Sequence, residues 1–340
     1  MFKKNILGLS LVELQRELIS LGMPKYTAKQ VMEWVYKKKI KSFEQITNIS
    51  KKNLNIIKDN FDIGLMPYSV VAESKDGTKK YLFPTSNGNV EAVMIPEDDR
   101  CTICVSSQVG CKMNCRFCMT GKSGFSGNMT AGEILNQVLS IDEVEEVSNI
   151  VFMGMGEPFD NLTEVLRAVE ILTAEWGFAF SPKRITVSTS GLTKGIKQFL
   201  DNTKCHLAIS LHNPFGEERE SIMPIERFNA IKEVIALLQE YDFAHQRRLS
   251  FEYIVFEGHN DTIHHAQEIV RLLNGLFCRV NLIRFHKVDG FDLSSPSNEK
   301  MIFFRDFLTK KGIITTIRRS RGEDISAACG QLKKQTQNHY

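Results

Sequence analysis

Three cysteines stand close together in the stretch GCKMNCRFCMTG (residues 110–121), where Cys111, Cys115 and Cys118 form a C-x3-C-x2-C pattern. Thiolate ligands favour zinc and iron–sulfur clusters. Structural zinc sites close with four protein ligands, whereas a catalytic metal keeps one position open. A [4Fe–4S] cube held by three cysteines has a fourth iron that is free to bind a chelating small molecule. We therefore expect a cluster with an open iron.

A zinc site is the alternative for the same region. Cys101 and Cys104 form a C-x2-C pair, and so do Cys115 and Cys118, which resembles two zinc knuckles. A non-catalytic, zinc-bearing RNA-binding module would use these four thiols. However, the residues around Cys104 read as a buried strand, and Cys111 would have no role.

Strand-like apolar runs alternate with helical stretches from residue 101 onward. Strands are expected at 101–107, 149–155, 184–190, 205–211, 249–257, 278–285 and 313–319, and helices at 130–142, 161–175, 193–200, 226–241, 262–274 and 297–311. Six βα units predict a parallel sheet curved into a partial (β/α)6 barrel, with a doubly wound sheet as the alternative. In both folds ligands bind at the carboxyl ends of strands, where SSQVGC, GMGEP, STSG and SLHNP occur.

The organisation along the chain predicts four parts. Residues 1–65 read as a small helical accessory domain, with Ser10 and Glu13 as a capping box. Short strands at 66–98 lead into the barrel at 99–332, and 333–340 is a tail. Residues 1–60 hold 12 Lys and Arg against 5 Asp and Glu. The clusters YKKKIK (36–41) and KK (51–52) are therefore expected to contact a nucleic-acid backbone, although a solvated helix face is the simpler interpretation.

The overall composition is that of a soluble globular protein, and the cysteine content favours the cytoplasm. Hydrophobic residues make up 42% and charged residues 24%, and no apolar run is long enough for a membrane span. Eight cysteines without an export signal indicate reactive or metal-binding thiols in a reducing compartment.

The cysteine spacing, its position after the first barrel strand and Phe117 before the third cysteine resemble the radical S-adenosylmethionine superfamily. GMGEP (154–158) is similar to that superfamily's motif for the methionine amino group. The resemblance implies a [4Fe–4S] cluster on the three cysteines and S-adenosylmethionine on its open iron. It also implies a set of cofactor contacts: Gly156, Glu157, Ser188, Ser210, Leu211, His212 and His286. Family members often have asparagine at the position of His286.

A closer family resemblance covers residues 90 to 332. The ordered motifs IPEDDR, CVSSQVGC, CRFC, GMGEP, STSG, SLH and RGEDISAACGQL resemble the RlmN-type radical adenine methyltransferases. This likeness implies methylation of C2 of an adenosine in 23S rRNA, at the peptidyl transferase centre, and in tRNA, next to the anticodon. The sister family that methylates C8 of the same adenine and confers antibiotic resistance shares the cysteines. It departs at IPEDDR, so C2 is the preferred position.

The family resemblance also implies roles for three further residues. One S-adenosylmethionine methylates Cys329, and a second gives a radical that abstracts hydrogen from the S-methyl group. The resulting carbon radical adds to C2 and joins protein to RNA. Glu91 is the implied proton acceptor, and Cys104 is the implied thiol that releases the product by a transient disulfide with Cys329. No role is assigned to Cys101.

These implications also specify the partners. The RNA substrates present a base turned out of its stack in a loop or single-stranded region. The reaction requires an electron donor. We expect the protein to be a monomer that does not bind a membrane.

Overall fold

The computed structural model of the protein describes residues 3–245, 247–288 and 290–333; the rest of the expected tail, 334–340, lies outside the described residues. Its centre is a ten-stranded sheet in the order β14-β13-β12-β11-β10-β9-β6-β5-β4-β3. These strands are β3 (Val70–Glu73), β4 (Lys79–Thr85), β5 (Gly88–Glu97), β6 (Arg100–Cys104), β9 (Val147–Phe152), β10 (Ile185–Thr189), β11 (His206–Ser210), β12 (Leu249–Val255), β13 (Arg279–Arg284) and β14 (Ile314–Ile317).

The sheet has a parallel part and an antiparallel part. Strand β6 and strands β9 to β14 are parallel, and β3, β4 and β5 extend the sheet as antiparallel neighbours of β6. The parallel strands follow one another in chain order without a reversal, which excludes the doubly wound alternative because that fold has a switch point. The sheet remains open between β14 and β3, so the expected partial barrel is confirmed.

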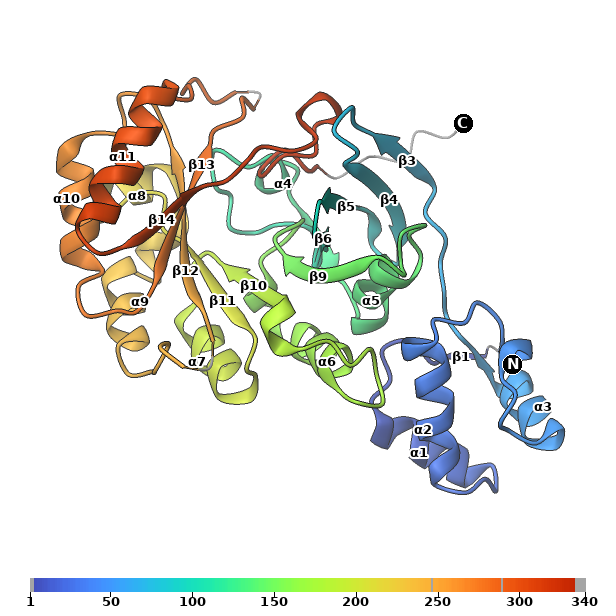
Figure 1. Ribbon diagram of the computed structural model, residues 1–340. Coiled ribbons are helices and arrows are strands. Elements are labelled where there is room, and N and C mark those ends of the chain that lie inside the picture. Colours follow the sequence, from blue (N-terminus) through green and yellow to red (C-terminus); the bar gives the residue numbers. More distant parts are fainter. Residues whose placement is uncertain (1–2, 246, 289, 334–340) are drawn as a thin grey trace.

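Helices cover the outer side of the parallel strands (Figure 1). They are α5 (Ala131–Leu139), α6 (Leu162–Thr173), α7 (Thr193–Asn202), α8 (Gly216–Ile222), α9 (Ile231–Leu238), α10 (Ile263–Leu272) and α11 (Asn298–Lys310). Strand β12, in the middle of the parallel part, is buried on both faces, and all seven of its residues are buried. The helix expected at 226–241 is shorter and begins only at Ile231, because residues up to Arg227 belong to a separate turn, η5 (Pro224–Arg227).

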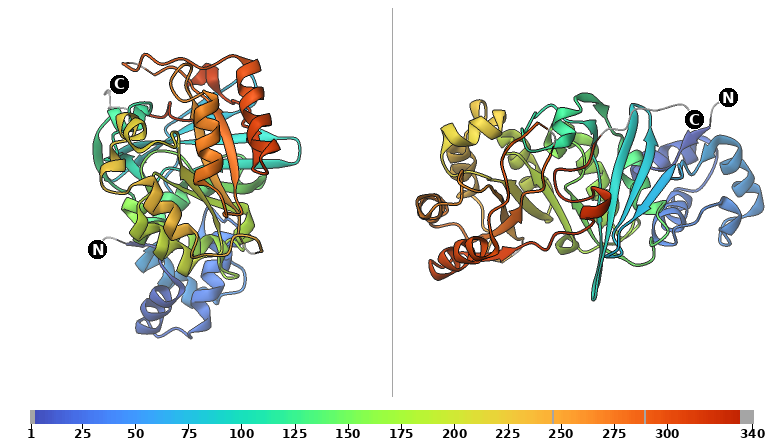
Figure 2. Two further views of the ribbon diagram at one scale, coloured as in Figure 1. Left: turned by 90° about the vertical axis from the view of Figure 1, so that its left-hand side faces the viewer. Right: turned by 90° about the horizontal axis from the view of Figure 1, so that it is seen from above.

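Residues 3–63 fold as a small helical unit beside α5 and α6, drawn in blue in Figures 1 and 2. It contains β1 (Lys4–Asn5), α1 (Leu11–Ser20), α2 (Tyr26–Met32), the π-helix η1 (Glu33–Lys37), η2 (Phe43–Gln45), α3 (Lys51–Asn60) and β2 (Phe61–Asp62). The capping box of Ser10 and Glu13 is confirmed. Strands β1 and β2 form a short parallel pair, which the alternation of the sequence did not reveal.

Two lysines of the YKKKIK cluster attach this unit to the barrel. The Nζ of Lys39 donates to the carbonyl of Val144 and pairs with Glu145, both at 2.9 Å. Lys41 donates to the carbonyl of Leu139. The expectation that the whole cluster faces RNA is therefore wrong for these two side chains, because domain docking uses them.

The chain after β14 crosses the opening of the sheet. The red segment in Figure 1 runs from β14 toward β3 and β4. It contains the turn η6 (Glu323–Ile325), and Asp324 accepts hydrogen bonds from the hydroxyl of Ser74 (2.5 Å) and from the N–H of Lys75 (3.1 Å). Residues 318–333 thereby connect the two edges that the sheet itself leaves apart.

Candidate active site

The three-cysteine loop is held by a small hairpin. Strands β7 (Gln108–Gly110) and β8 (Phe125–Asn128) pair in antiparallel fashion on either side of it. Gly110 has φ +80°, and an added Cβ would lie 1.6 Å from the carbonyl oxygen of Gly124, so only glycine fits at this turn. Cys118 then caps the short helix α4 (Met119–Lys122). The sequence prediction contained neither this hairpin nor α4. The two strands have three and four residues and the helix has four, which is too short for a periodic pattern.

The thiols of this loop influence one another. Burial raises the pKa of Cys111 to about 12. Burial also raises the pKa of Cys115, and its Cys118 and Cys111 neighbours raise it further. In the part of the chain that the structure describes, no three His, Cys, Asp or Glu side chains are grouped for a single metal ion.

The GMGEP loop packs directly on the segment before the cysteines. Gly156 has φ +101°, and a Cβ there would lie 2.6 Å from the Cβ of Gln108. The N–H of Glu157 donates to Oε1 of Gln108 at 2.9 Å. The buried Glu157 carboxylate accepts from the N–H groups of Phe159 (3.0 Å) and Ser190 (2.8 Å). The ends of β6, β9 and β10 are thus tied together around this carboxylate.

A fully buried arginine holds the next two strand ends. Arg219, on α8, donates to the carbonyls of Ser190 (2.8 Å), Ser210 (2.8 Å) and Leu211 (3.0 Å), and it pairs with the buried Glu226. The sequence prediction missed Arg219, which stands in the charged stretch GEERES and reads there as a surface residue. Ser188 lies on β10, paired with Ala208 of β11.

His212 connects the strand end to the cysteine loop. Its φ is +53°, its Nδ1 accepts from the N–H of Ile254 at 3.0 Å, and its ring meets that of Phe117 edge-on at 4.8 Å. Burial, followed by the charge of Arg219, lowers the pKa of His212 to about 3. The ring is therefore neutral at physiological pH, with Nδ1 as the acceptor.

The segment that carries Cys329 lies against the cysteine loop. The N–H of Met119 donates to the carbonyl of Gly330 at 2.8 Å, and the hydroxyl of Thr120 donates to the carbonyl of Leu332 at 2.7 Å. A Cβ on Gly330 would come within 3.1 Å of the carbonyl oxygen of Phe117. Cys329 itself is exposed. A distant part of the sequence thus reaches the loop expected to hold a cluster.

Glu91 is joined to the same segment. It is 1% exposed on β5, and its carboxylate accepts from the N–H of Lys333 at 3.0 Å and pairs with Lys80 at 3.2 Å. The Nζ of Lys80 also donates to the carbonyl of Ser326, at 3.2 Å. Lys80 therefore bridges the carboxylate and the loop before Cys329, a connection that the sequence prediction did not contain.

Cys104 and Cys329 share a cationic neighbour. Cys104 is buried at the end of β6, and burial, together with the nearby Cys329, raises its pKa to about 12. The charge of Arg318 lowers the pKa of Cys104. The electrostatic interaction of Arg318 with Cys329 is stronger than its interaction with Cys104. The guanidinium also lies 3.5 Å from the carboxylate of Glu252. Cys104 therefore has the cationic neighbour expected for a reactive thiol, but the effect of burial on its pKa is larger than that of Arg318.

The comparisons with known proteins agree along almost the whole chain. Residues 105–273 match the Radical SAM superfamily, and residues 4–63 match the ribosomal RNA large subunit methyltransferase N-terminal domain. A "probable dual-specificity RNA methyltransferase RlmN" of Parabacteroides distasonis is 55% identical over 97% of this chain and 96% of its own. The chain belongs to the RlmN family. The "dual-specificity RNA methyltransferase RlmN" of Campylobacter hominis is 44% identical, with 97% of both chains covered.

A solved structure supports the fold of this RlmN-family chain. A radical SAM methyltransferase from Sphaerobacter thermophilus is 39% identical and superposes with a TM-score of 0.90, over 97% of this chain and 99% of that one. The protein is therefore a radical S-adenosylmethionine RNA methyltransferase, and the non-catalytic zinc module is excluded. It uses one [4Fe–4S] cluster and S-adenosylmethionine, two molecules of it in each turnover.

The residues of this RlmN-family site fit both groups. Cys111 and Cys115, whose pKa values are raised by burial and by the neighbouring thiols, would be stabilised as thiolates by the iron ions of a cluster, with Cys118 as the third ligand. Burial raises the pKa of Glu157, and among the described residues no cation pairs with it. A positively charged amino group of the cofactor would supply that missing partner.

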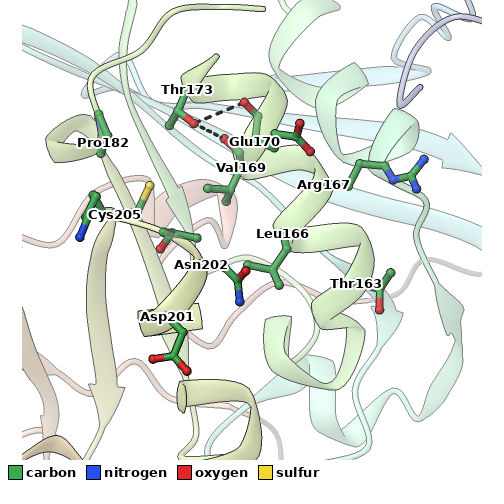
Figure 3. A pocket seen from close by; sticks show the side chains of 12 residues that line it. Thr163, Leu166, Arg167, Val169, Glu170, Thr173, Pro182, Asp201, Asn202 and Cys205 are labelled. Atoms are coloured by element: carbon green, nitrogen blue, oxygen red, sulfur yellow. Dashed lines mark hydrogen bonds between the residues drawn. The ribbon is translucent and has the colours of Figure 1, made fainter. Parts of the chain in front are cut away.

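Two cavities lie at different places in this RlmN-family chain. One, of about 540 Å³, lies among the strands and is lined by residues that include Met153, Glu252, His286, Arg318 and Cys329. The other, of about 710 Å³, lies on the outer side between α6 and α7 and contains none of the expected site residues (Figure 3).

His286 faces the first cavity from the loop after β13. Its Nε2 is 3.0 Å from the hydroxyl of Ser320, which belongs to the crossing segment. Burial lowers its pKa. The structure thus brings His286 beside the segment that carries Cys329.

Proposed function

We propose that this enzyme methylates C2 of an adenosine in 23S rRNA and in tRNA, with Cys329 as the carrier of the new carbon. The observation that carries the proposal is the convergence of Glu91, Cys104 and Cys329. Hydrogen bonds join the Cys329 segment to the cysteine loop through Gly330 and to Glu91 through Lys333, and Cys104 is its electrostatic neighbour.

The cysteine loop and the strand ends hold the cofactors in this proposal. Cys111, Cys115 and Cys118 would ligate the cluster, which with the bound cofactor supplies a carbon radical. Glu157 would hold the cofactor's amino group, since it is a buried carboxylate without a cation partner among the described residues. The remaining contacts are assigned to the strand ends and their neighbours: Gly156, Ser188, Ser210, Leu211, His212 and His286.

Cys329 is suited to carry a methyl group that must meet both the cofactor and the base. It is exposed, and the small residues Ala327, Ala328 and Gly330 around it leave its sulfur accessible. A carbon radical on its S-methyl group can add to C2, a position that lacks a nucleophilic lone pair. The adduct then keeps protein and RNA joined until it has lost the C2 proton and one electron, which the cluster would accept, and the carbon–sulfur bond breaks.

Glu91 is the proposed acceptor of the C2 proton. Its burial shields it from water, and the Lys80 ammonium and the Lys333 N–H fix its orientation. Cys104 is the proposed resolving thiol: its thiolate sulfur attacks the sulfur of Cys329 and a disulfide forms. The carbon–sulfur bond breaks with its electron pair passing to the methylene carbon, which takes up a proton, and the methylated base leaves. Arg318 would stabilise the thiolate during that attack.

The RNA substrates and the cellular setting are part of the proposal. The relatives are named dual-specificity RNA methyltransferases, and the match at residues 4–63 is to a ribosomal RNA large subunit methyltransferase domain. The helical unit 1–65 would serve as the accessory RNA-binding domain, with 66–98 as the extension into the barrel at 99–332. All eight cysteines are free, which suits a reducing cytoplasm. Within the described residues, no helix has the length and apolar character to cross a membrane.

Nucleoside mass spectrometry tests the position of methylation. Anaerobic turnover of cluster-loaded enzyme with a reductant, S-adenosylmethionine and a transcribed 23S rRNA fragment should give 2-methyladenosine. A product with 8-methyladenosine would assign the chain the chemistry of the sister family instead. The relatives that carry the RlmN name at 44–55% identity favour the first result.

A further inference from the structure

Four exposed arginines stand at the amino ends of the barrel strands. Arg100 begins β6, Arg184 and Arg248 directly precede β10 and β12, and Arg279 begins β13. Parallel pairing brings these ends to one edge of the sheet; for example, Arg279 pairs with Ser250, two residues beyond Arg248. All four arginines line the cavity of about 540 Å³. We call this set the arginine mouth.

The charges of the arginine mouth are largely uncompensated. Arg100 pairs with Glu97, but among the described residues no carboxylate lies within ion-pair distance of Arg184, Arg248 or Arg279. Nearby, His206 has its pKa lowered to about 4 by burial and then by the surrounding arginines and lysine, Arg248 first. Glu252 lines the same cavity and attracts Arg248 from beyond ion-pair distance, so four arginines face two carboxylates there. An excess of like charge is typical of a site for a polyanion.

The same cavity joins the arginine mouth to the reactive thiol. Cys329 and Arg318 line it at the end opposite the mouth, beyond the carboxyl ends of β6 and β14. Its wall is polar: Asn281 donates to Glu252 at 2.8 Å and accepts from Thr316 at 2.8 Å. A polar channel of this volume is in the range of small-molecule sites of about 300–1,000 Å³ and fits a hydrogen-bonding base better than an apolar ligand.

We propose that substrate RNA approaches the barrel from its amino-terminal edge, where Arg184, Arg248 and Arg279 bind phosphates beside the flipped adenosine, whose base enters the cavity toward Cys329. The inference rests on the proposed function for the identity of the base. The cofactor and the RNA phosphates then lie at opposite ends of the strands. The base passes through the cavity to Cys329 and meets His286, which lines the same cavity.

The experiment compares two charge-removing variants of cluster-loaded enzyme. Arg248→Gln with Arg279→Gln removes two cations of the mouth. Lys194→Gln with Lys197→Gln removes two exposed cations from the outer helix α7. Fluorescence anisotropy with a labelled 23S rRNA fragment measures Kd over a series of salt concentrations. Each phosphate contact contributes about 0.7 to 0.9 to the slope of log Kd against log salt.

The proposal expects the mouth variant to lose about 1.4 to 1.8 from that slope, with the α7 variant unchanged. Arg248→Lys with Arg279→Lys keeps the charge and should keep most of the slope. An unchanged slope in the glutamine variant, or an equal loss in the α7 variant, would overturn the proposal. If the melting temperature of the double variant shows misfolding, the single variant Arg279→Gln, at an exposed position, replaces it. The slope of log Kd against log salt should then fall by about 0.7 to 0.9.

The binding measurement separates this inference from the proposed function. RNA affinity needs no turnover, so a loss of slope would support the arginine mouth even if the wild-type enzyme gave no 2-methyladenosine. Conversely, 2-methyladenosine from wild type together with an unchanged slope in the mouth variant would support the reaction and reject the route of the RNA.

Discussion

The carboxylate of Glu91 accepts a hydrogen bond of 3.0 Å from the backbone N–H of Lys333, across 242 positions of the chain. Lys333 lies four residues beyond Cys329, and Lys80 holds the loop before Cys329 to the same carboxylate. The proposed base and the proposed carbon carrier are therefore positioned by one short segment. That segment also crosses the opening of the sheet, so closure of the barrel and assembly of the site are the same event.

The Glu91→Gln variant tests the proton acceptor. Glutamine keeps a carbonyl oxygen for the Lys333 N–H but cannot accept the C2 proton, so product formation should fall by about 10²–10⁴-fold. The covalent link between Cys329 and RNA should accumulate, because only the step after adduct formation is blocked. Denaturing gels with labelled RNA and product mass spectrometry measure both. Wild-type product levels in this variant would remove Glu91 from the mechanism.

The Cys104→Ala variant tests the resolving thiol. Without an attacking sulfur the adduct cannot be released, and a protein–RNA cross-link should appear on denaturing gels. Cys101→Ala is the matched control: it lies on the same strand, but the charges that act on its thiol are those of Glu146 and Glu143 rather than that of Arg318. Free methylated RNA from the Cys104 variant, at the control's rate, would refute the disulfide step.

The resolution step should depend on pH in a defined direction. Burial raises the pKa of Cys104 to about 12, so the thiolate is a minor form near neutrality and increases about tenfold with each pH unit up to that value. Single-turnover formation of the Cys104–Cys329 disulfide should accelerate between pH 7 and pH 9, measured by rapid quench and peptide mass spectrometry. A rate independent of pH over this range would mean that the thiolate is already formed.

Arg219 should be needed for stability as well as for positioning. Arg219→Ala leaves Glu226 buried without its partner and frees the carbonyls of Ser210 and Leu211, so the free energy of unfolding should fall by about 3–5 kcal/mol. Arg227→Ala removes an exposed pair with Glu220 and should cost about 0–1 kcal/mol. Urea unfolding monitored by circular dichroism compares the two. Equal losses would show that the buried pair has no special role.

Hydrophobic periodicity and motif spacing predicted much of the barrel. The residues after β9, β10 and β11 were expected at strand ends and are found there, because a buried parallel strand is recognisable from its own apolar run. Partners far apart in sequence were not predictable in this way. Arg219, Lys80 and Arg318 read as ordinary surface charges, and only the tertiary fold places them beside strand ends, Glu91 and Cys104.

The contacts of the lysines in the basic amino-terminal region were also not predictable from the sequence. Its charge excess is a property of composition, whereas the partner of each lysine is a property of the fold. Lys39 and Lys41 bind the barrel, while Lys38 lies 3.6 Å from the centre of the Trp34 ring. The arginines that line a cavity belong instead to four separate strand starts, which no local run of charge reveals.

Isotope transfer tests the central claim most directly, namely that Cys329 carries the new carbon as a methylene group. Cluster-loaded enzyme would be given S-adenosylmethionine with three deuteriums on its methyl group, together with the rRNA fragment and a reductant. The account predicts 2-methyladenosine that retains two of the three deuteriums, since one is abstracted from the S-methyl group of Cys329. Product that retains all three would contradict it, because the methyl group would then have moved intact.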